Sequence, residues 1–207
     1  MFKNITAPVL ILTSPRTGST ALGRYIQDNC NIENIAYFTE PQQVIGQYKL
    51  FKDCVNNSTN FILKEMLYRF NREYTKSMVD SLLTNSYKIR LYRKNFIKQV
   101  VSAYITYERN FRSFYMIGDN LTINDTIDIT PVKLSHVAVG LKKWNDELIN
   151  STIPFDLTIC YEDLEHLDID NTGYRKTPQP LNYNKLITVT TELVNSLNID
   201  SITKLPR

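Results

Sequence analysis

The stretch Pro8-Val-Leu-Ile-Leu-Thr13-Ser-Pro-Arg-Thr-Gly-Ser-Thr20 decides the fold class. Its first part is a short continuous apolar run, which is typical of a strand buried on both faces of a parallel sheet. After the turn, residues 20–27 place apolar side chains at helical spacing, with Ser19 or Thr20 as the expected N-cap. The opening unit is therefore a buried strand, a tight loop and a helix.

The same alternation continues along the chain. Strands are predicted at residues 35–39, 60–64, 87–92 and 155–161, and helices at 72–83, 96–107, 134–149 and 183–197. Strands separated by helices predict right-handed crossovers and an α/β fold with a central, mostly parallel sheet flanked by helices. The length suits a single domain over residues 1–207. Residues 110–131 are expected to form either a lid or binding loop, or a poorly ordered insertion.

Composition excludes several classes of protein. A formal net charge of +3 is too small for the basic footprint of a nucleic-acid binder, so no nucleic-acid partner is expected. Three cysteines without CxxC spacing indicate neither a disulfide framework nor a zinc site, and no metal requirement is expected. No apolar run reaches the length of a membrane span. These features predict a cytoplasmic protein and leave its oligomeric state open.

The loop between the first strand and helix has the chemistry of an anion site, because a helix N-terminus offers unpaired N–H groups and a positive dipole end. Gly18 lets the backbone approach an anion closely, and Arg16 supplies a forked cation that matches phosphate. Thr17, Ser19 and Thr20 add hydroxyl donors. The alternative is a turn that only caps its helix. The nucleoside-triphosphate loop G-x-x-x-x-G-K-[ST] would need a first glycine and a lysine that are missing here, which disfavours a kinase.

Residues 14–22, S-P-R-T-G-S-T-A-L, resemble the 5′-phosphosulfate-binding loop of sulfotransferases that use 3′-phosphoadenosine-5′-phosphosulfate (PAPS). The family pattern is P-[KR]-[ST]-G-[ST]-[ST], and the carbohydrate and bacterial glycolipid branches carry Arg. The resemblance implies a P-loop-like sulfotransferase fold that moves a sulfuryl group from PAPS to an acceptor hydroxyl and releases 3′,5′-adenosine bisphosphate (PAP). Arg16 would stabilise the leaving phosphate. The resemblance implies that PAPS is contacted in this loop by Arg16, Thr17, Gly18, Ser19, Thr20 and Ala21.

A second segment, residues 90–104, is similar to the family's 3′-phosphate element, in which a strand ends in Arg and a serine follows from the next helix. The implied contacts are Arg93 or Lys94, together with Ser102. The spacing from Arg93 to Ser102 resembles a bacterial branch with a double arginine, whereas the common R-D-P form aligns Lys94 with the arginine. The chain departs from that form because Phe96 stands where proline is usual. The alternative is a solvated charge pair at a strand end.

Residues 161–164, Y-E-D-L, resemble a late turn of the family with an architectural role, in which Glu162 and Asp163 would cap the short helix that follows. Residues 38–41, F-T-E-P, resemble the segment that holds the glutamate base. This resemblance implies Glu40 as the base, provided that partial burial raises its pKa. The alternative is a surface glutamate before a proline turn. Lys64 is either a second cation in the site or a surface lysine.

The two histidines, His136 and His166, do not occupy the family's base position. Arg175 and Lys176 lie in a late basic loop that could close over the nucleotide. Residues 42–51 and 111–131 are expected as acceptor loops, whose aromatic and amide content favours a carbohydrate or glycolipid acceptor, or another small molecule. A catalytically inactive nucleotide-binding module and, less favoured, a small-molecule kinase remain as alternatives.

Overall fold

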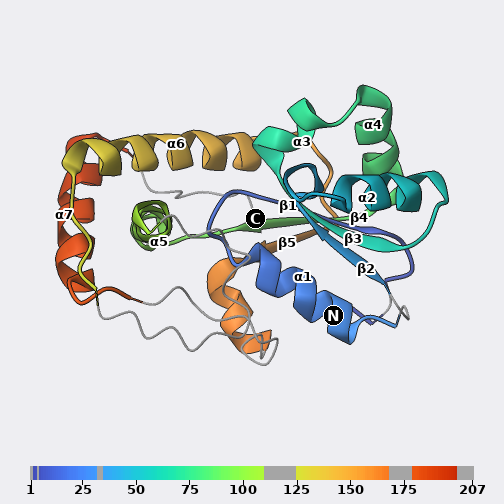
Figure 1. Cartoon of the computed structure of the whole chain (residues 1–207), viewed down its shortest axis with the longest axis horizontal. Helices are drawn as coiled ribbons and strands as arrows, with labels where there is room; N and C mark the ends of the chain where they lie inside the picture. Colours follow the sequence, from blue (N-terminus) through green and yellow to red (C-terminus); the bar gives the residue numbers. More distant parts are fainter. Residues whose placement is uncertain (1, 4, 32–34, 110–124, 168–178, 200–207) are drawn as a thin grey trace.

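The computed structural model describes residues 2–3, 5–31, 35–109, 125–167 and 179–199, without the side chains of 165–167. Its centre is a five-stranded sheet in the order β2-β3-β1-β4-β5, and every neighbouring pair is parallel (Figure 1). The strands are β1 (Val9–Thr13), β2 (Ala36–Thr39), β3 (Phe61–Met66), β4 (Tyr87–Tyr92) and β5 (Leu157–Cys160). The α/β prediction is thus confirmed, and the all-parallel sheet flanked by helices is consistent with the broad Rossmann-like or P-loop-like class.

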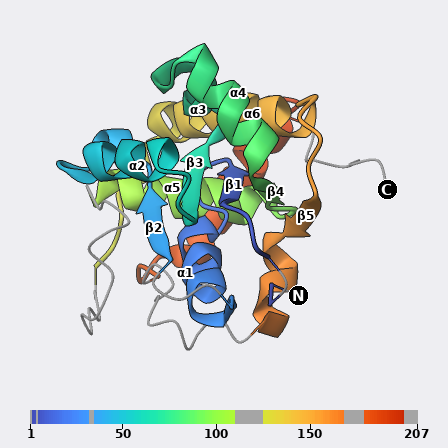
Figure 2. The same cartoon turned by 90° about the vertical axis from the view of Figure 1, so that its right-hand side faces the viewer.

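Helices cover both faces of this sheet (Figures 1 and 2). Helix α1 (Ser19–Asn29) packs Leu22 and Ile26 against the face that carries Val9 and Ile11. The opposite face carries Leu10 and Leu12 and is covered by α2 (Gln47–Asn56), α3 (Leu67–Glu73) and α4 (Lys76–Asn85). All five residues of β1 are buried, which is why the run from Val9 to Leu12 is continuously apolar rather than alternating.

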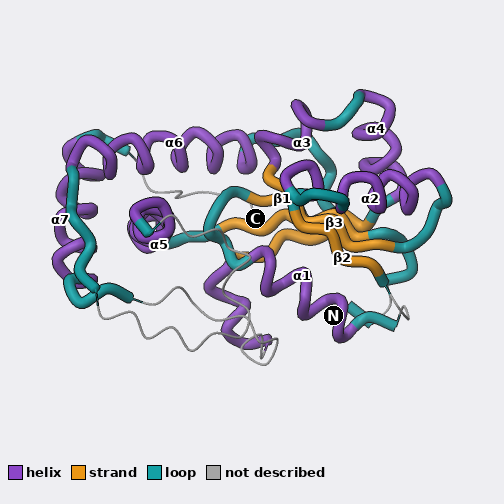
Figure 3. Tube along the Cα trace, in the orientation of Figure 1, coloured by secondary structure: helices purple, strands orange, loops and turns teal. Residues whose placement is uncertain are grey.

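A third layer of helices lies beyond the carboxyl ends of the strands (Figures 1 and 3). It consists of α5 (Phe96–Glu108), α6 (Pro131–Ile149) and α7 (Tyr183–Ser196), which share an apolar cluster that includes Tyr104 and Leu134. Ligands of open α/β sheets bind outside the carboxyl ends of the strands, where the connections from adjacent strands diverge. Here α1 leaves β1 on one face while α3 leaves the neighbouring β3 on the other, so this edge between β1 and β3 is such a point.

Two predicted segments differ from the structure. The helix expected over 72–83 is divided, because Tyr74 is extended and Thr75 caps α4 by accepting a hydrogen bond from the N–H of Met78 at 3.4 Å. Residues 42–51, expected as an acceptor loop, instead form the short 3-10 helix η1 (Pro41–Gln43) and the first half of α2. Phe51 is fully buried there, so this segment contributes to the core.

Parts of other predictions lie outside the described residues. The loop expected at 110–131 is described only from residue 125, and its last residue already begins α6. The single domain over residues 1–207 stays a prediction. No helix within the described ranges is both long enough and apolar enough to cross a membrane.

Candidate functional site

The loop after β1 makes a tight turn into α1. Gly18 is the N-cap of α1 and has a left-handed backbone, with φ 72° and ψ 14°. A Cβ atom on Gly18 would come within 2.6 Å of the Tyr161 ring, so glycine is needed for both conformation and space. The prediction that Ser19 or Thr20 caps the helix is wrong, because both residues already lie in its first turn. Their backbone N–H groups, like that of Ala21, have no carbonyl partner within the helix.

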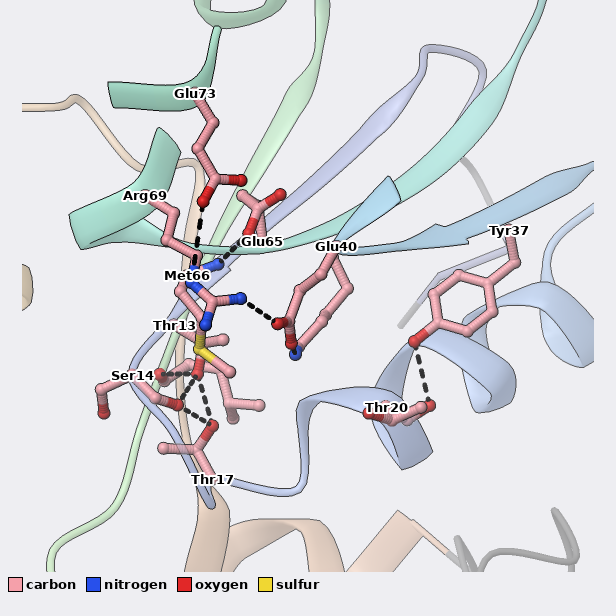
Figure 4. Close-up of polar contacts among 12 residues, drawn as sticks. Thr13, Ser14, Thr17, Thr20, Tyr37, Glu40, Glu65, Met66, Arg69 and Glu73 are labelled. Atoms are coloured by element: carbon pink, nitrogen blue, oxygen red, sulfur yellow. Dashed lines mark hydrogen bonds and ion pairs between the residues drawn. The ribbon is translucent and has the colours of Figure 1, made fainter. Parts of the chain in front are cut away.

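The side chain of Thr17 points into the protein. It is fully buried, and its hydroxyl donates to the carbonyl of Ser14 at 3.1 Å and contacts the hydroxyl of Thr13 (Figure 4). Thr13 also donates to the carbonyl of Leu91 on β4 at 3.0 Å. The Thr17 hydroxyl therefore fixes the loop to the sheet, and only its backbone N–H is left as a predicted ligand contact.

Two buried amides that sequence reasoning missed hold the loop from the helical layer. Gln99 of α5 is fully buried and donates to the carbonyl of Pro15 at 2.7 Å and to the hydroxyl of Ser14 at 3.1 Å. Asn145 of α6 is 1 % exposed, and its amide donates to Gln99 Oε1 at 2.9 Å. Burying primary amides is costly unless they are hydrogen-bonded, so this network specifies the position of the loop.

The structure brings together residues of the two segments that were predicted to bind opposite ends of the donor. Arg16 Nε donates to Ser102 Oγ at 3.1 Å, although the two residues are 86 positions apart. Arg93 Nη1 donates to the carbonyl of Arg16 at 3.2 Å. The side chain of Lys94 is exposed. Arg16, Arg93 and Ser102 thus form one cluster at the carboxyl end of β1 and β4.

Arg93 lies against the loop between β1 and α1. Its guanidinium is 4.4 Å from the centre of the Tyr161 ring, the same ring that touches Gly18. Its side chain is 12 % exposed, and burial lowers its pKa, although tyrosine and carboxylate neighbours oppose the shift. Within the described part of the chain, Arg93 Nε is buried without a hydrogen-bond partner, and the carboxylate of Glu162 lies 3.9 Å away.

Glu162 does not act as the simple cap of its own helix. Its carboxylate accepts hydrogen bonds from the backbone N–H groups of Lys94 at 3.0 Å and Asn95 at 2.9 Å. The turn after β4 is therefore fixed to the short helix η3 (Tyr161–Leu167). Burial acts to raise the pKa of Glu162, but these hydrogen bonds and one from Cys160 outweigh it and lower the pKa.

Glu40 follows β2 and belongs to a buried charge cluster (Figure 4). Its carboxylate accepts a hydrogen bond from the ammonium group of Lys64 and another from Arg69 Nη1 at 2.6 Å. Burial acts to raise its pKa, but the two cations outweigh burial and the net shift is downward. The base role expected for Glu40 depended on a raised pKa, and this condition is not met. Lys64 is 2 % exposed, so it is a buried lysine rather than a surface one.

A second buried carboxyl, Glu65, was not identified from the sequence. It is fully buried, and its carboxyl oxygens accept from the N–H of Met66 at 2.9 Å and the hydroxyl of Tyr74 at 2.8 Å. Burial raises its pKa to about 7. Alternation in β3 places Lys64 and Glu65 on opposite faces of the sheet, and Lys64 is on the face that meets Glu40.

Other predicted residues do not join these clusters. His136 is exposed on α6, while Arg175, Lys176 and the side chain of His166 lie outside the described residues. A cavity of about 360 Å³ lies between residues 126–131 and α7, and no residue of the loop between β1 and α1 lines it. Among the described residues, no group of three His, Cys, Asp or Glu could hold a metal ion.

No protein-family model matches the chain, and a search of curated proteins finds no match. Chemical capability therefore has to be judged from the site. The loop with Arg16, Ser102 and the start of α1 suits an extended anion, because it combines a forked cation, a hydroxyl and a helix N-terminus. Glu40 and Lys64 place an ionised carboxylate and an ammonium group at the neighbouring strand ends.

Proposed function

We propose that the chain is a PAPS-dependent sulfotransferase with a P-loop-like sulfotransferase fold, acting on a hydroxyl of a carbohydrate or glycolipid. The observation that carries the proposal is the contact between Arg16 and Ser102, which unites the loop with the segment that resembles the 3′-phosphate element. A donor with a 5′-phosphosulfate and a 3′-phosphate needs both elements at one sheet edge. The all-parallel sheet supports this placement, because its carboxyl edge is where such folds bind ligands.

The residues of the site divide the chemistry between them. In the proposed reaction a new S–O bond forms to the acceptor oxygen while the bond from sulfur to the phosphate oxygen breaks. Arg16 and the N-terminus of α1 stabilise the negative charge left on the phosphate. Glu40 takes the acceptor proton, with a carboxylate that is ionised but less basic than that of an ordinary glutamate, because its pKa is lowered.

The ion pairs of Glu40 favour a second candidate, a catalytically inactive nucleotide-binding module. A carboxylate held by Lys64 and Arg69 is a weaker base than one whose pKa burial alone has raised. In this second candidate the chain binds PAPS and PAP but does not turn over, and the Glu40 cluster only stabilises the sheet edge.

The two candidates are separated by incubating the protein with PAPS labelled in the sulfuryl group and a panel of glycans and glycolipids. The sulfotransferase proposal expects labelled product that is lost in Glu40→Gln, while both proteins still bind PAP. Binding of PAP with no transfer to any acceptor, and no release of labelled sulfate, would favour the inactive module. A failure to bind PAP would reject both.

A further inference from the structure

Three consecutive carbonyl groups of the loop are held from inside the protein. The hydroxyl of Thr17 donates to the carbonyl of Ser14 at 3.1 Å. Gln99 Nε2 donates to the carbonyl of Pro15 at 2.7 Å, and Arg93 Nη1 donates to that of Arg16 at 3.2 Å. The donors come from the loop itself, from α5 and from the end of β4, so unrelated parts of the chain turn this backbone in one direction.

This arrangement determines where the N–H groups point. Across a trans peptide the carbonyl of one residue and the N–H of the next point in opposite directions. With the carbonyls of Pro15 and Arg16 turned inward, the N–H groups of Arg16 and Thr17 point the other way. Arg16 and Gly18 have positive φ values of 62° and 72°, and left-handed residues in such a turn let successive N–H groups converge on an anion.

We propose that Arg93 is a positioning residue for the 5′-phosphosulfate loop rather than a contact of the 3′-phosphate. This inference rests on the proposed function. For the 3′-phosphate contact the resemblance left Arg93 and Lys94 as alternatives, and the inference excludes Arg93. The guanidinium of Arg93 donates from Nη1 to the Arg16 carbonyl and lies over the Tyr161 ring, and the Glu162 carboxylate is 3.9 Å from its Nε, which makes no hydrogen bond among the described residues. Lys94 is exposed and directly precedes Asn95, the N-cap of the helix that carries Ser102.

Arg93 and Gln99 then act alike although only one is charged. Each donates to one loop carbonyl, and each is anchored by a second group, Tyr161 for Arg93 and Asn145 for Gln99. Removing either donor frees a carbonyl to rotate and turns the next N–H away from the anion. The variant should therefore bind the 5′-phosphate of a nucleotide more weakly, whether or not the nucleotide carries a phosphate at the 3′ position.

The test compares PAP with 5′-AMP, which lacks the 3′-phosphate, by calorimetric titration of wild type, Arg93→Met and the adjacent Lys94→Met. We expect Arg93→Met to weaken both ligands by the same factor, about tenfold for one charge-assisted hydrogen bond. Lys94→Met should weaken PAP by about fivefold, as for one modest ionic contact, and leave 5′-AMP unchanged. Full stoichiometry and an unchanged melting temperature exclude a loss through unfolding, and Gln99→Met serves as a second variant if Arg93→Met does not fold.

Weakening of PAP alone in Arg93→Met would overturn the inference, because it would place Arg93 on the 3′-phosphate. Unchanged affinity for both ligands would overturn it as well. In each of these cases the wild type still binds PAP. If the wild type binds neither ligand, the proposed function itself fails, so the two failures are distinguishable.

Discussion

The carboxyl edge of the sheet has two halves that handle charge differently. On the side of β1 and β4, the loop is held by the amide of Gln99 and the guanidinium of Arg93, and Arg16 donates to the hydroxyl of Ser102. On the side of β2 and β3, Glu40 is neutralised by Lys64 and Arg69. The first half combines Arg16 and a serine hydroxyl with the N-terminus of α1, whereas in the second a buried carboxylate is paired with two cations of the chain.

Because of this difference, variants in the two halves should have different effects on ligand affinity and on the stability of the fold. Loss of a contact in the β1–β4 half should mainly weaken an anionic ligand. Loss of a partner in the β2–β3 half leaves a buried charge unpaired and should mainly destabilise the fold. Variants on each side can therefore break or sharpen the distinction.

The largest expected effect is on the β2–β3 side. Lys64→Met should lower the free energy of unfolding at pH 7 by about 4 kcal/mol, because it removes one partner of a buried ion pair. The lowered pKa of Glu40 means that its ion pairs stabilise the fold above the ordinary glutamate pKa and lose this effect as the pH falls through the folded-state value. Urea denaturation at several pH values should show the deficit narrowing in acid.

Arg69→Met is the matched comparison, since its side chain is 23 % exposed while that of Lys64 is 3 % exposed. It should cost only about 1 kcal/mol, as expected for a partly solvated pair. The double variant Lys64→Met/Glu40→Gln should recover most of the loss. Equal costs for Lys64→Met and Arg69→Met would show that burial does not govern this cluster.

A somewhat smaller effect is expected at the loop. Gly18→Ala should destabilise the fold by about 3 kcal/mol, combining left-handed strain with a contact at 2.6 Å to the Tyr161 ring. Gly46→Ala is its control, because Gly46 also has a positive φ, 83°, but a Cβ there meets nothing within 4 Å. It should cost about 1 kcal/mol from strain alone. Thermal unfolding of both variants measures the difference, and similar losses would refute close packing of Gly18 on Tyr161.

The smallest of these effects concerns Glu65. Its folded-state pKa of about 7 exceeds the ordinary value of 4.5, so the protonated carboxyl stabilises the fold in acid and this contribution is lost as the pH rises to about 7. Between pH 5 and 8 the loss should reach about 2 kcal/mol. Glu65→Gln should remove this part of the pH dependence in denaturant titrations. If wild type and variant have parallel pH profiles, Glu65 is already ionised in the fold.

The opening unit was predictable because β1 is apolar throughout and is followed by a loop whose glycine is required at one position. The division between α3 and α4 was not, since the apolar spacing of residues 72–83 continues through Tyr74 and only tertiary packing makes that residue extended. In the site, Arg16 and Ser102 were found through motif resemblance. Gln99 and Asn145 were missed because a neutral amide on a helix has the same sequence signal whether it faces solvent or the core.

The pKa of Glu40 shows a different limit. Its place after β2 was readable from the chain, but the sign of its pKa shift depends on Lys64 and Arg69, which approach it only through the pairing of β2 with β3 and the start of α3. Burial and ion pairing shift the pKa of a carboxyl in opposite directions. A sequence indicates that both effects are possible at such a position and does not say which is larger.

The central claim is that the carboxyl edge of β1 and β4 binds a nucleotide with phosphates at its 3′ and 5′ positions. Isothermal titration of the wild type with PAP, beside ATP with magnesium, tests it most directly, with Arg16→Ala and Ser102→Ala as site variants. We predict micromolar binding of PAP that both variants abolish, and no binding of ATP. Absence of PAP binding, or a preference for magnesium ATP, would contradict the claim.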